Sequence, residues 1–378
     1  MKAAKMRAAI LLTVVACLAA VAFASRIRHE MVDFEVYRTA GARAAAGESL
    51  YRASDEHYQF KYFPASAFLF TPFAALPDTA ARALWFALSV ALLVGMVTLS
   101  LRQLPSRVVP VPIIVIGTIL TLAKFYAHEL TLGQANLLFG FVAVAALAQL
   151  QRRRDTGAGA TFGVASVVKP YGLLFLPYLI ATKRFHAAAA CALVLVLGLA
   201  WPSITYGIDG NVRLLDSWRE AVTGSTFVNL TNQDNVSIAA MSVKWLGHGS
   251  AAYWLTILTS FALVGVCAAV VVMRRRSAAP EYLEVALLLT AITLLSPQGW
   301  DYVLLLSTPA VVLLINTLPR LNRVLQAVTV ACLALIGLTI YDLMGRAAYA
   351  RFMALSIITV VYGFVIALLV YVRAKQLH

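Results

Sequence analysis

Long apolar runs alternate along the chain with short polar or basic turns. A helix needs about 20 apolar residues to cross the roughly 30 Å hydrocarbon core of a bilayer. These runs are continuous, whereas the strands of a membrane barrel alternate apolar and polar positions. The pattern therefore predicts an all-α, polytopic membrane protein with ten crossings, at residues 6–24, 80–101, 108–123, 133–150, 187–203, 251–273, 282–296, 301–318, 324–341 and 352–372.

Two further apolar segments, 61–76 and 160–182, do not fit a simple crossing. Prolines interrupt the first segment and follow it, and proline inside a helix removes a hydrogen bond and kinks the chain. We interpret 61–76 as a helix on, or dipping into, the external surface. The second segment has a basic turn at each end, so we expect it to enter and leave on one side. It is read as a pair of short helices broken at Lys169-Pro170, or as two closely connected spans.

Composition and charge agree with this reading. The chain is 61% hydrophobic and 13% charged, against roughly 25% charged in soluble domains, so no large soluble domain is expected. The net charge of +14 comes from basic turns, which the positive-inside bias places in the cytoplasm. Basic turns also suit anionic lipid headgroups, so we expect membrane lipids rather than nucleic acid as partners. The turns lie at 2–7, 102–107, 151–154, 183–186, 274–277, 319–323 and 373–375.

The first apolar run ends in a sequence, 22–24, that fits a signal-peptide cleavage site. We expect an uncleaved span, because the run is long for a signal peptide and a polar cluster follows it directly. The cysteines stand alone in apolar stretches without paired spacing, so neither zinc nor a disulfide framework is predicted. They are Cys17, Cys191, Cys267 and Cys332.

The same topology places every strongly polar cluster on the opposite, external side. The clusters are 31–38, 124–136, 229–237 and 296–302. A protein that gathers carboxylates, amides and an imidazole on one face of a bilayer is expected to carry out chemistry there. No internal repeat divides the chain, so we expect one membrane domain, 1–378, with an amphipathic first external loop and a long external loop at 204–250.

Asp33 is the first candidate for that chemistry. Asp33, Tyr37 and Gly41 are spaced by four and therefore share a helix face. Glycine on that face lets another group approach closely. An acid beside an external cavity is suited to act as a base, and the alternative is an interfacial Asp that caps a surface helix.

The cluster 124–136 combines a cation, an imidazole, a carboxylate and amides. Its amides open a predicted helix, and helix N-termini attract anions. We expect its polar members to line a substrate site: Lys124, Tyr126, His128, Glu129, Gln134 and Asn136. Lys169 is a costly cation in an apolar run. It either binds a phosphate or snorkels to the inner surface.

Two later clusters offer groups for a sugar. The amides and carboxylate of Asn232, Gln233, Asp234 and Asn235 are suited to sugar hydroxyls, and the alternative is a plain turn. The turn at 296–302 supplies Gln298, Trp300 and Asp301. A sugar can stack on the indole, but an interfacial Trp with a helix-capping Asp explains the same residues.

Taken in order, these motifs resemble a known family. An Asp in the first external loop is followed by GESLY (47–51), KYFP (61–64), LGQANLL (132–138), KPYGLLFLP (169–177), NQDN (232–235) and SPQGWDY (296–302). Over residues 31 to 310 this order resembles the bacterial DUF2029 proteins, glycosyltransferase family 87. The group includes mycobacterial mannosyltransferases of phosphatidylinositol mannoside synthesis.

The resemblance implies a GT-C-type bundle of about 10–13 transmembrane helices, with juxtamembrane helices in the first external loop, 31–78. The implied reaction moves a hexose, such as mannose, from a polyprenyl-phosphate donor to a hydroxyl of a glycolipid or glycan acceptor. Asp33 matches the family's catalytic base, and one displacement inverts the anomeric centre. A lone Asp stands where some other GT-C families have an acidic pair, so no cofactor is expected.

The KYFP motif adds Lys61 and Tyr62 to the implied substrate site. Candidates to stabilise the leaving phosphate are Lys61, Lys124, His128 and Lys169. The implied location is the bacterial cytoplasmic membrane, with the active site facing the periplasm or exterior. A lipid or solute transporter or flippase is the main alternative, although transporters place polar groups near the membrane midplane, often in inverted repeats. An acyltransferase would use His128 as its only external histidine near an acid.

Overall fold

The computed structural model describes residues 20–277 and 279–377, and every regular element in that part of the chain is a helix. The elements that follow the first predicted crossing are short. They are η1 (Ile27–His29), α2 (Val32–Ala46), η2 (Ala53–Tyr58), α3 (Pro64–Phe68) and α4 (Thr71–Ala74). The apolar segment 61–76 therefore forms two helices of five and four residues, too short to cross a bilayer.

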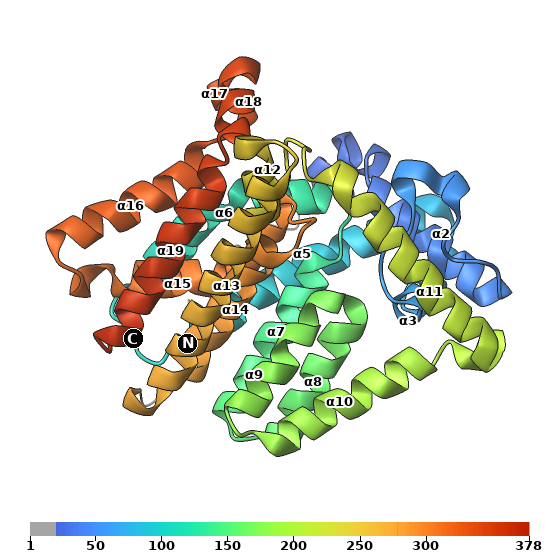
Figure 1. Ribbon diagram of the computed structural model, residues 1–378, viewed down its shortest axis with the longest axis horizontal. Coiled ribbons are helices and arrows are strands. Elements are labelled where there is room, and N and C mark those ends of the chain that lie inside the picture. The colour runs from blue at the N-terminus through green and yellow to red at the C-terminus, as the bar shows by residue number, and fades with distance from the viewer. Residues whose placement is uncertain (1–19, 278, 378) are drawn as a thin grey trace, which may run out of the picture.

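The next part of the chain forms a bundle (Figure 1). Its elements are α5 (Asp78–Arg102), α6 (Val111–Leu132), α7 (Asn136–Gln151), α8 (Asp155–Val168), η3 (Pro170–Leu174), α9 (Phe175–Ala181) and α10 (Phe185–Ala200). The segment 160–182 is broken at Lys169-Pro170, as the proline predicts. Lys169 has extended dihedral angles there (φ −142°, ψ 133°).

The segment 204–250 contains two helices, α11 (Ser203–Asn229) and α12 (Ile238–Leu246). The remaining elements are α13 (Ser250–Val272), η4 (Met273–Arg276), α14 (Glu281–Leu295), η5 (Asp301–Ser307), α15 (Thr308–Thr317), η6 (Leu318–Arg320), α16 (Arg323–Leu338), α17 (Tyr341–Met344), α18 (Arg346–Ala354) and α19 (Ile357–Ala374). Helices α10 and α11 meet at an angle of 91°, and Figure 1 shows α11 passing beside α2 and α3.

Five helical segments of the described chain are long and apolar enough to cross a membrane: α5, α6, α13, residues 301–320 and α19. The bent pair α10–α11 makes a sixth if it is one span. An all-α, multi-pass membrane protein is thus confirmed, but the length criterion gives fewer than ten crossings. Helices α7 and α16 have 16 residues each and rise only about 24 Å at ~1.5 Å per residue. The first predicted crossing, 6–24, lies mostly outside the described residues, as does Cys17.

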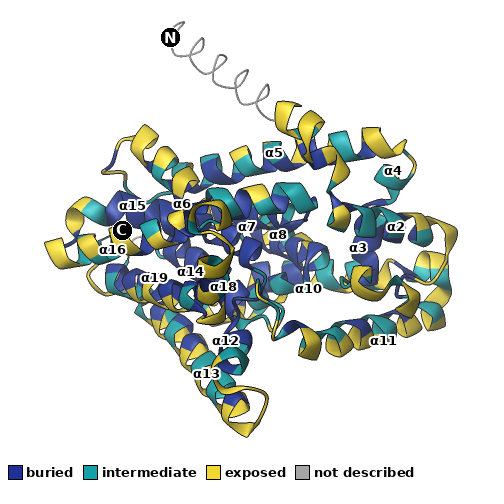
Figure 2. Cartoon of the chain, turned by 90° about the horizontal axis from the view of Figure 1, so that it is seen from above, coloured by how far each residue is buried: buried dark blue, intermediate teal, exposed yellow. Residues whose placement is uncertain are grey.

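The core of the bundle is centred on α14 and α15. Every residue of α15 is buried, and α14 is buried from Glu281 to Leu294. The peripheral helices α10 and α13 instead expose large apolar side chains, such as Leu193 (59%) and Phe261 (72%). This distribution, visible in Figure 2, is that of a bundle whose outer apolar surface faces lipid.

A pair of glycines brings α8 and α10 together. A Cβ atom on Gly159 would lie 1.9 Å from the carbonyl oxygen of Ala187, and one on Gly163 would lie 2.7 Å from Val194 Cβ. Small residues four apart let the backbones of membrane helices approach closely. The short helices α8 and α9 are thereby fixed on the bundle, and Lys169 is the residue between α8 and η3.

Gly159→Ala is therefore expected to lower the thermal unfolding midpoint of the detergent-solubilised protein, because overpacking a close contact costs about 1–3 kcal/mol. Gly265→Ala is the matched control, since a Cβ there meets nothing within 4 Å. The control is expected to unfold at the wild-type temperature or above it, because alanine favours helix over glycine by about 1 kcal/mol. Equal midpoints for the two variants would contradict this packing.

Helix α2 is held against the short helices by a close backbone contact and an aromatic cluster. Gly41 lies so near α4 that an added Cβ would be 2.6 Å from the carbonyl carbon of Phe70, as the spacing of Gly41 predicts. Phe34 stacks on Trp85 of α5 at 5.6 Å, and Tyr37 stacks on Phe70 at 4.8 Å. These contacts fix the face of α2 that carries Asp33.

Candidate active site

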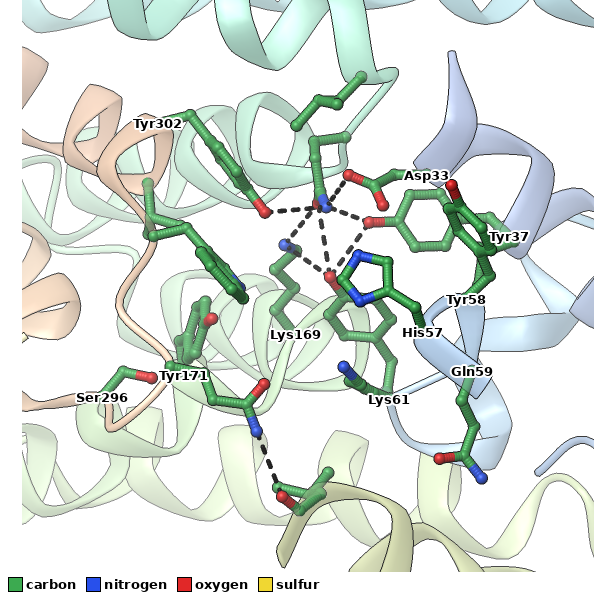
Figure 3. A pocket seen from close by; sticks show the side chains of 18 of the residues that line it. Asp33, Tyr37, His57, Tyr58, Gln59, Lys61, Lys169, Tyr171, Ser296 and Tyr302 are labelled. Carbon is green, nitrogen blue, oxygen red and sulfur yellow. Dashed lines mark hydrogen bonds between the residues drawn. The ribbon is translucent and has the colours of Figure 1, made fainter. Parts of the chain in front are cut away.

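A cavity of about 440 Å3 lies where α2, the end of α6, the α8–η3 break, α11 and the loops 232–234 and 296–303 meet. We call it the polar cavity, and Figure 3 shows many of its lining side chains. Segments far apart in sequence contribute to it, from Val32 to Val303. Folding therefore joins the polar clusters that the sequence places on one side of the membrane.

Gln134 connects the groups at the inner end of this cavity. Helix α6 ends at Gly133, whose left-handed conformation (φ 69°) turns the chain. The Gln134 amide nitrogen then donates to Asp33 Oδ2 at 2.7 Å. Its oxygen accepts from Tyr37 at 2.5 Å and from Lys169 at 3.1 Å. Because Lys169 can only donate, the amide is oriented with its N–H groups toward the carboxylate.

Asp33 lies in the first turn of α2 and lines the polar cavity. The bond from Gln134 is its one side-chain hydrogen bond among the described residues, and no ion pair involves it there. Burial raises the pKa of Asp33, and the bond from Gln134 and the charge of Lys169 oppose part of that rise. The result is a fixed carboxylate that is more basic than an exposed one.

Lys169 is buried and fully hydrogen-bonded. Its side chain is 1% exposed, which does not fit snorkelling to a membrane surface. The ammonium donates to Asn136 Oδ1 at 2.7 Å, and to the Tyr62 hydroxyl and Gln134 Oε1 at 3.1 Å each. An ammonium has three protons, so these three acceptors occupy all of them.

The other basic side chains of the cavity form fewer hydrogen bonds than Lys169. Within the described chain, the Lys61 ammonium has no hydrogen-bond partner, and burial lowers its pKa while the Asp33 charge opposes that effect. His57 lies beside it on the wall (Figure 3). His128, from the last turns of α6, lines the cavity and places Nδ1 3.2 Å from Asp301 Oδ1.

The loops 232–237 and 296–302 hold each other in place. Asn235 and Trp300 form an isolated antiparallel bridge, and the Asp301 amide donates to the Asp234 carbonyl at 2.9 Å. The Asn235 side chain donates to the carbonyls of Asn229 and Pro297. Burial raises the pKa of Asp234, and the nearby Asp301 charge adds to the rise. The two clusters that sequence analysis treats separately thus form one wall.

The polar cavity brings together eleven of the candidate residues. They are Asp33, Tyr37, Lys61, Tyr62, His128, Gln134, Lys169, Asn232, Asp234, Gln298 and Trp300. Seven others do not line it: Lys124, Tyr126, Glu129, Asn136, Gln233, Asn235 and Asp301.

Six of these seven have a side-chain hydrogen bond to another part of the described protein, and Gln233 is the exception. The Lys124 ammonium donates to the carbonyl and hydroxyl of Thr339 at the end of α16. Glu129 accepts from the Leu137 amide and the Asn136 side chain, and so caps the start of α7. Asn136 also receives a bond from Lys169, and Asp301 contacts His128. Only the backbone carbonyl of Gln233 makes a side-chain contact, with Lys244.

Helix α6 extends to Leu132. Residues 124–132, which the predicted crossings 108–123 and 133–150 leave as an external connection, are therefore helical. The cause is that their polar side chains find partners inside the protein. Tyr126, for example, contacts the Thr308 hydroxyl at 2.7 Å.

Several cavity residues were not predicted from the sequence. Tyr171, Ser296 and Tyr302 lie within the recognised KPYG and SPQGWDY motifs, so a signal for them was present. His57 and Trp218 had no such signal. Trp218 reaches the cavity because α11 folds back over residues 57–62, where its indole donates to the Lys61 carbonyl at 3.2 Å. Among the described residues, no three His, Cys, Asp or Glu side chains form a group that could hold a metal ion.

The fold and the cavity define a multi-pass membrane protein with two carboxylates, two lysines and two histidines of the described chain around one polar cavity. The sequence model of glycosyltransferase family 87 matches residues 60–297, more than half of the chain, and the chain belongs to this family. It is therefore a membrane glycosyltransferase, which takes a sugar donor and an acceptor. Asp33 precedes the matched region. No curated protein and no solved structure matches the chain.

Proposed function

We propose that the protein transfers a hexose from a polyprenyl-phosphate donor to an acceptor hydroxyl on the extracytoplasmic side of the bacterial cytoplasmic membrane. Asp33 acts as the general base, and the anomeric centre is inverted. The observation that carries this proposal is the Asp33 carboxylate, fixed by Gln134, in a cavity that also holds the Lys61 ammonium, which has no hydrogen-bond partner among the described residues. The carboxylate is suited to take up the acceptor proton, and the ammonium is suited to stabilise the departing phosphate.

At the acceptor, Asp33 removes a proton. The acceptor oxygen forms the new bond to the anomeric carbon, and its proton passes to the carboxylate. A positioned base contributes about 10²- to 10⁴-fold. Gln134 holds one carboxylate oxygen and leaves Oδ1 without a partner among the described residues. The raised pKa of Asp33 makes its ionised form a better proton acceptor.

At the donor, the bond between the anomeric carbon and the phosphate oxygen breaks, and its electron pair stays on the phosphate. The departing polyprenyl phosphate gains negative charge and is stabilised by hydrogen-bond donors already in place. Lys61, His57 and His128 are the groups suited to this task. The isoprenoid tail extends into the bilayer from the apolar part of the wall, to which Val32, Leu132 and Val303 contribute.

Lys169 has a different role in this proposal. Its three bonds to protein acceptors make it a positioning residue for Gln134, and through Gln134 for Asp33. Lys124 has no part at the donor, because its ammonium is occupied by Thr339.

Lys61→Met is expected to raise the KM for the donor by about tenfold or more with a smaller change in kcat, since a charge-assisted bond to phosphate contributes about 1.5–3 kcal/mol. Lys183→Met, in the turn between α9 and α10 and outside the cavity lining, is the matched control and should leave KM unchanged. A wild-type donor KM in folded Lys61→Met protein would remove Lys61 from the donor site.

The test of the proposed function is turnover by the purified protein in proteoliposomes. The substrates are synthetic polyprenyl-phosphate mannose, glucose and galactose, supplied with a membrane extract as the source of acceptor. Release of polyprenyl phosphate together with a new glycoside supports the proposal. Sugar transfer from nucleotide sugars alone, or movement of the intact donor across the bilayer without cleavage, would exclude it.

A further inference from the structure

A second cavity of about 420 Å3 lies on the other side of α2. We call it the outer cavity. Its lining residues are His29, Glu30, Val32, Glu35, Val36, Thr39, Arg43, Asp55, Tyr58, Phe60 and Arg82. Three of them, Val32, Val36 and Tyr58, also line the polar cavity. The two cavities are therefore neighbours that share a wall.

Asp33 lies at that wall. It follows Val32 directly on α2, and Val36 lies one turn further along. The Tyr58 ring forms the rest of the partition and is 55% exposed. It packs edge-on against His57 with ring centroids 5.3 Å apart. A molecule in the outer cavity therefore contacts side chains that also line the cavity of the Asp33 carboxylate.

The arginines and carboxylates of the outer cavity already form ion pairs, within the cavity or with a neighbouring residue. Arg43 binds both oxygens of Asp55. Arg82 contacts Glu35 at 3.0 Å, and Glu30 pairs with Arg26 at 2.8 Å. An incoming anion finds no free arginine there. The polar cavity, by contrast, holds the Lys61 ammonium, for which the described part of the chain provides no hydrogen-bond partner.

The same residues are suited to hydroxyl groups. The Glu35 and Glu30 side chains remain 41% and 37% exposed, and ionised carboxylates accept several hydrogen bonds at once. The ring of Tyr58 offers a flat apolar face beside them. Paired charges, exposed carboxylate oxygens and an aromatic ring together match an uncharged, hydroxyl-rich ligand.

We infer that the outer cavity binds the acceptor, and that the bound portion of the acceptor is an uncharged saccharide. This inference rests on the proposed function. The donor phosphate occupies the polar cavity beside the Lys61 ammonium, the saccharide occupies the outer cavity, and Asp33 lies in the polar cavity next to the shared wall. Because the arginines of the outer cavity are already paired, the anionic donor is not drawn into the acceptor position.

Thr39→Trp tests the inference, because Thr39 lines only the outer cavity and an indole there fills it. Ala42→Trp is the matched control, since Ala42 is exposed on the same helix and lines neither cavity. Both proteins are compared with wild type for thermal unfolding. Binding of mannotriose, a neutral probe, and of tri-galacturonate, a charged one, is then measured by saturation-transfer NMR without any donor.

Mannotriose is expected to bind the wild type and Ala42→Trp, and to bind Thr39→Trp about tenfold or more weakly. Tri-galacturonate is expected to bind none of them measurably. Equal mannotriose binding by Thr39→Trp and wild type, no binding by wild type, or preference for tri-galacturonate would each overturn the inference. If Thr39→Trp does not fold, Thr39→Phe is measured in its place. Its smaller ring also occupies the outer cavity, and the same results are expected.

The same variants are then assayed for turnover. With polyprenyl-phosphate mannose and a membrane extract, Thr39→Trp is expected to lower the ratio of transfer to donor hydrolysis by about tenfold or more, and Ala42→Trp to leave it unchanged. An unaltered ratio in Thr39→Trp contradicts the acceptor assignment. If the wild type cleaves no polyprenyl-phosphate sugar, the proposed function is wrong. The binding measurement is made without donor, so it tests saccharide binding in the outer cavity independently of that outcome.

Discussion

Asp33→Asn is expected to reduce sugar transfer by about 10²- to 10⁴-fold, the usual contribution of a positioned general base. Asparagine keeps the shape of the side chain and can still accept the bond from Gln134, but it cannot take up the acceptor proton. Donor binding should persist, because Lys61 and the histidines remain. The measurement is transfer from a synthetic polyprenyl-phosphate sugar, with donor binding measured in parallel.

Stability separates this prediction from a helix-capping role. Burial raises the pKa of Asp33 in the folded protein, so its contribution to stability is present below the unfolded pKa and is lost as the pH rises through the folded pKa. At neutral pH the ionised carboxylate is a cost, and Asp33→Asn should unfold at the wild-type temperature or above it. The structure places Met31 at the N-cap of α2 and shows no side-chain capping bond there. A folded Asp33→Asn enzyme with wild-type turnover would remove Asp33 from the catalytic role.

Lys169→Met is expected to have the second largest effect. It leaves Asn136 Oδ1 without a donor and removes one of the bonds to Gln134 and Tyr62, which keep their contacts with Tyr37. An unsatisfied buried group costs about 1–3 kcal/mol. Because Gln134 then loses the bond that orients it toward Asp33, kcat should fall by about 10²-fold or more, as it does when a positioning contact is lost. Thermal unfolding and the kinetics of the folded fraction are the measurements.

Lys124→Met is the matched control for this substitution. Lys124 is also partly buried and bonded through its ammonium, to Thr339, but it lies outside the polar cavity. It should lose stability while the folded enzyme keeps wild-type kcat and KM. If Lys169→Met instead raised the donor KM with kcat unchanged, Lys169 would be a phosphate ligand and the positioning role would be rejected.

Much of the fold was predictable because it follows from local patterns. Apolar runs of sufficient length predict helices, and proline at position 170 predicts the break that places Lys169 in the interior. The lengths of the crossings were less predictable. Helix α6, for example, was predicted to end at residue 123 but continues to Leu132, because polar side chains in its last turns bond to groups inside the protein.

The site was predictable only in part, for a geometric reason. Lys124 and His128 are four residues apart and share one face of α6, yet only His128 reaches the polar cavity. One helical turn, about 5.4 Å, places Lys124 beside Thr339 instead. The spacing shows that two residues share a helix face. Which of them reaches the cavity depends on elements that are distant in the sequence. His57 and Trp218 come to the site through such elements, so no local pattern indicates them.

The single-turnover rate of sugar transfer as a function of pH tests the central claim most directly, because it follows the protonation of the base itself. The base must be ionised, and burial raises the pKa of Asp33. The wild-type rate should therefore rise with pH through an apparent pKa above about 4, the ordinary value for Asp. The residual rate of Asp33→Asn should lack this rise. Identical pH profiles for wild type and Asp33→Asn would contradict the assignment of Asp33 as the catalytic base.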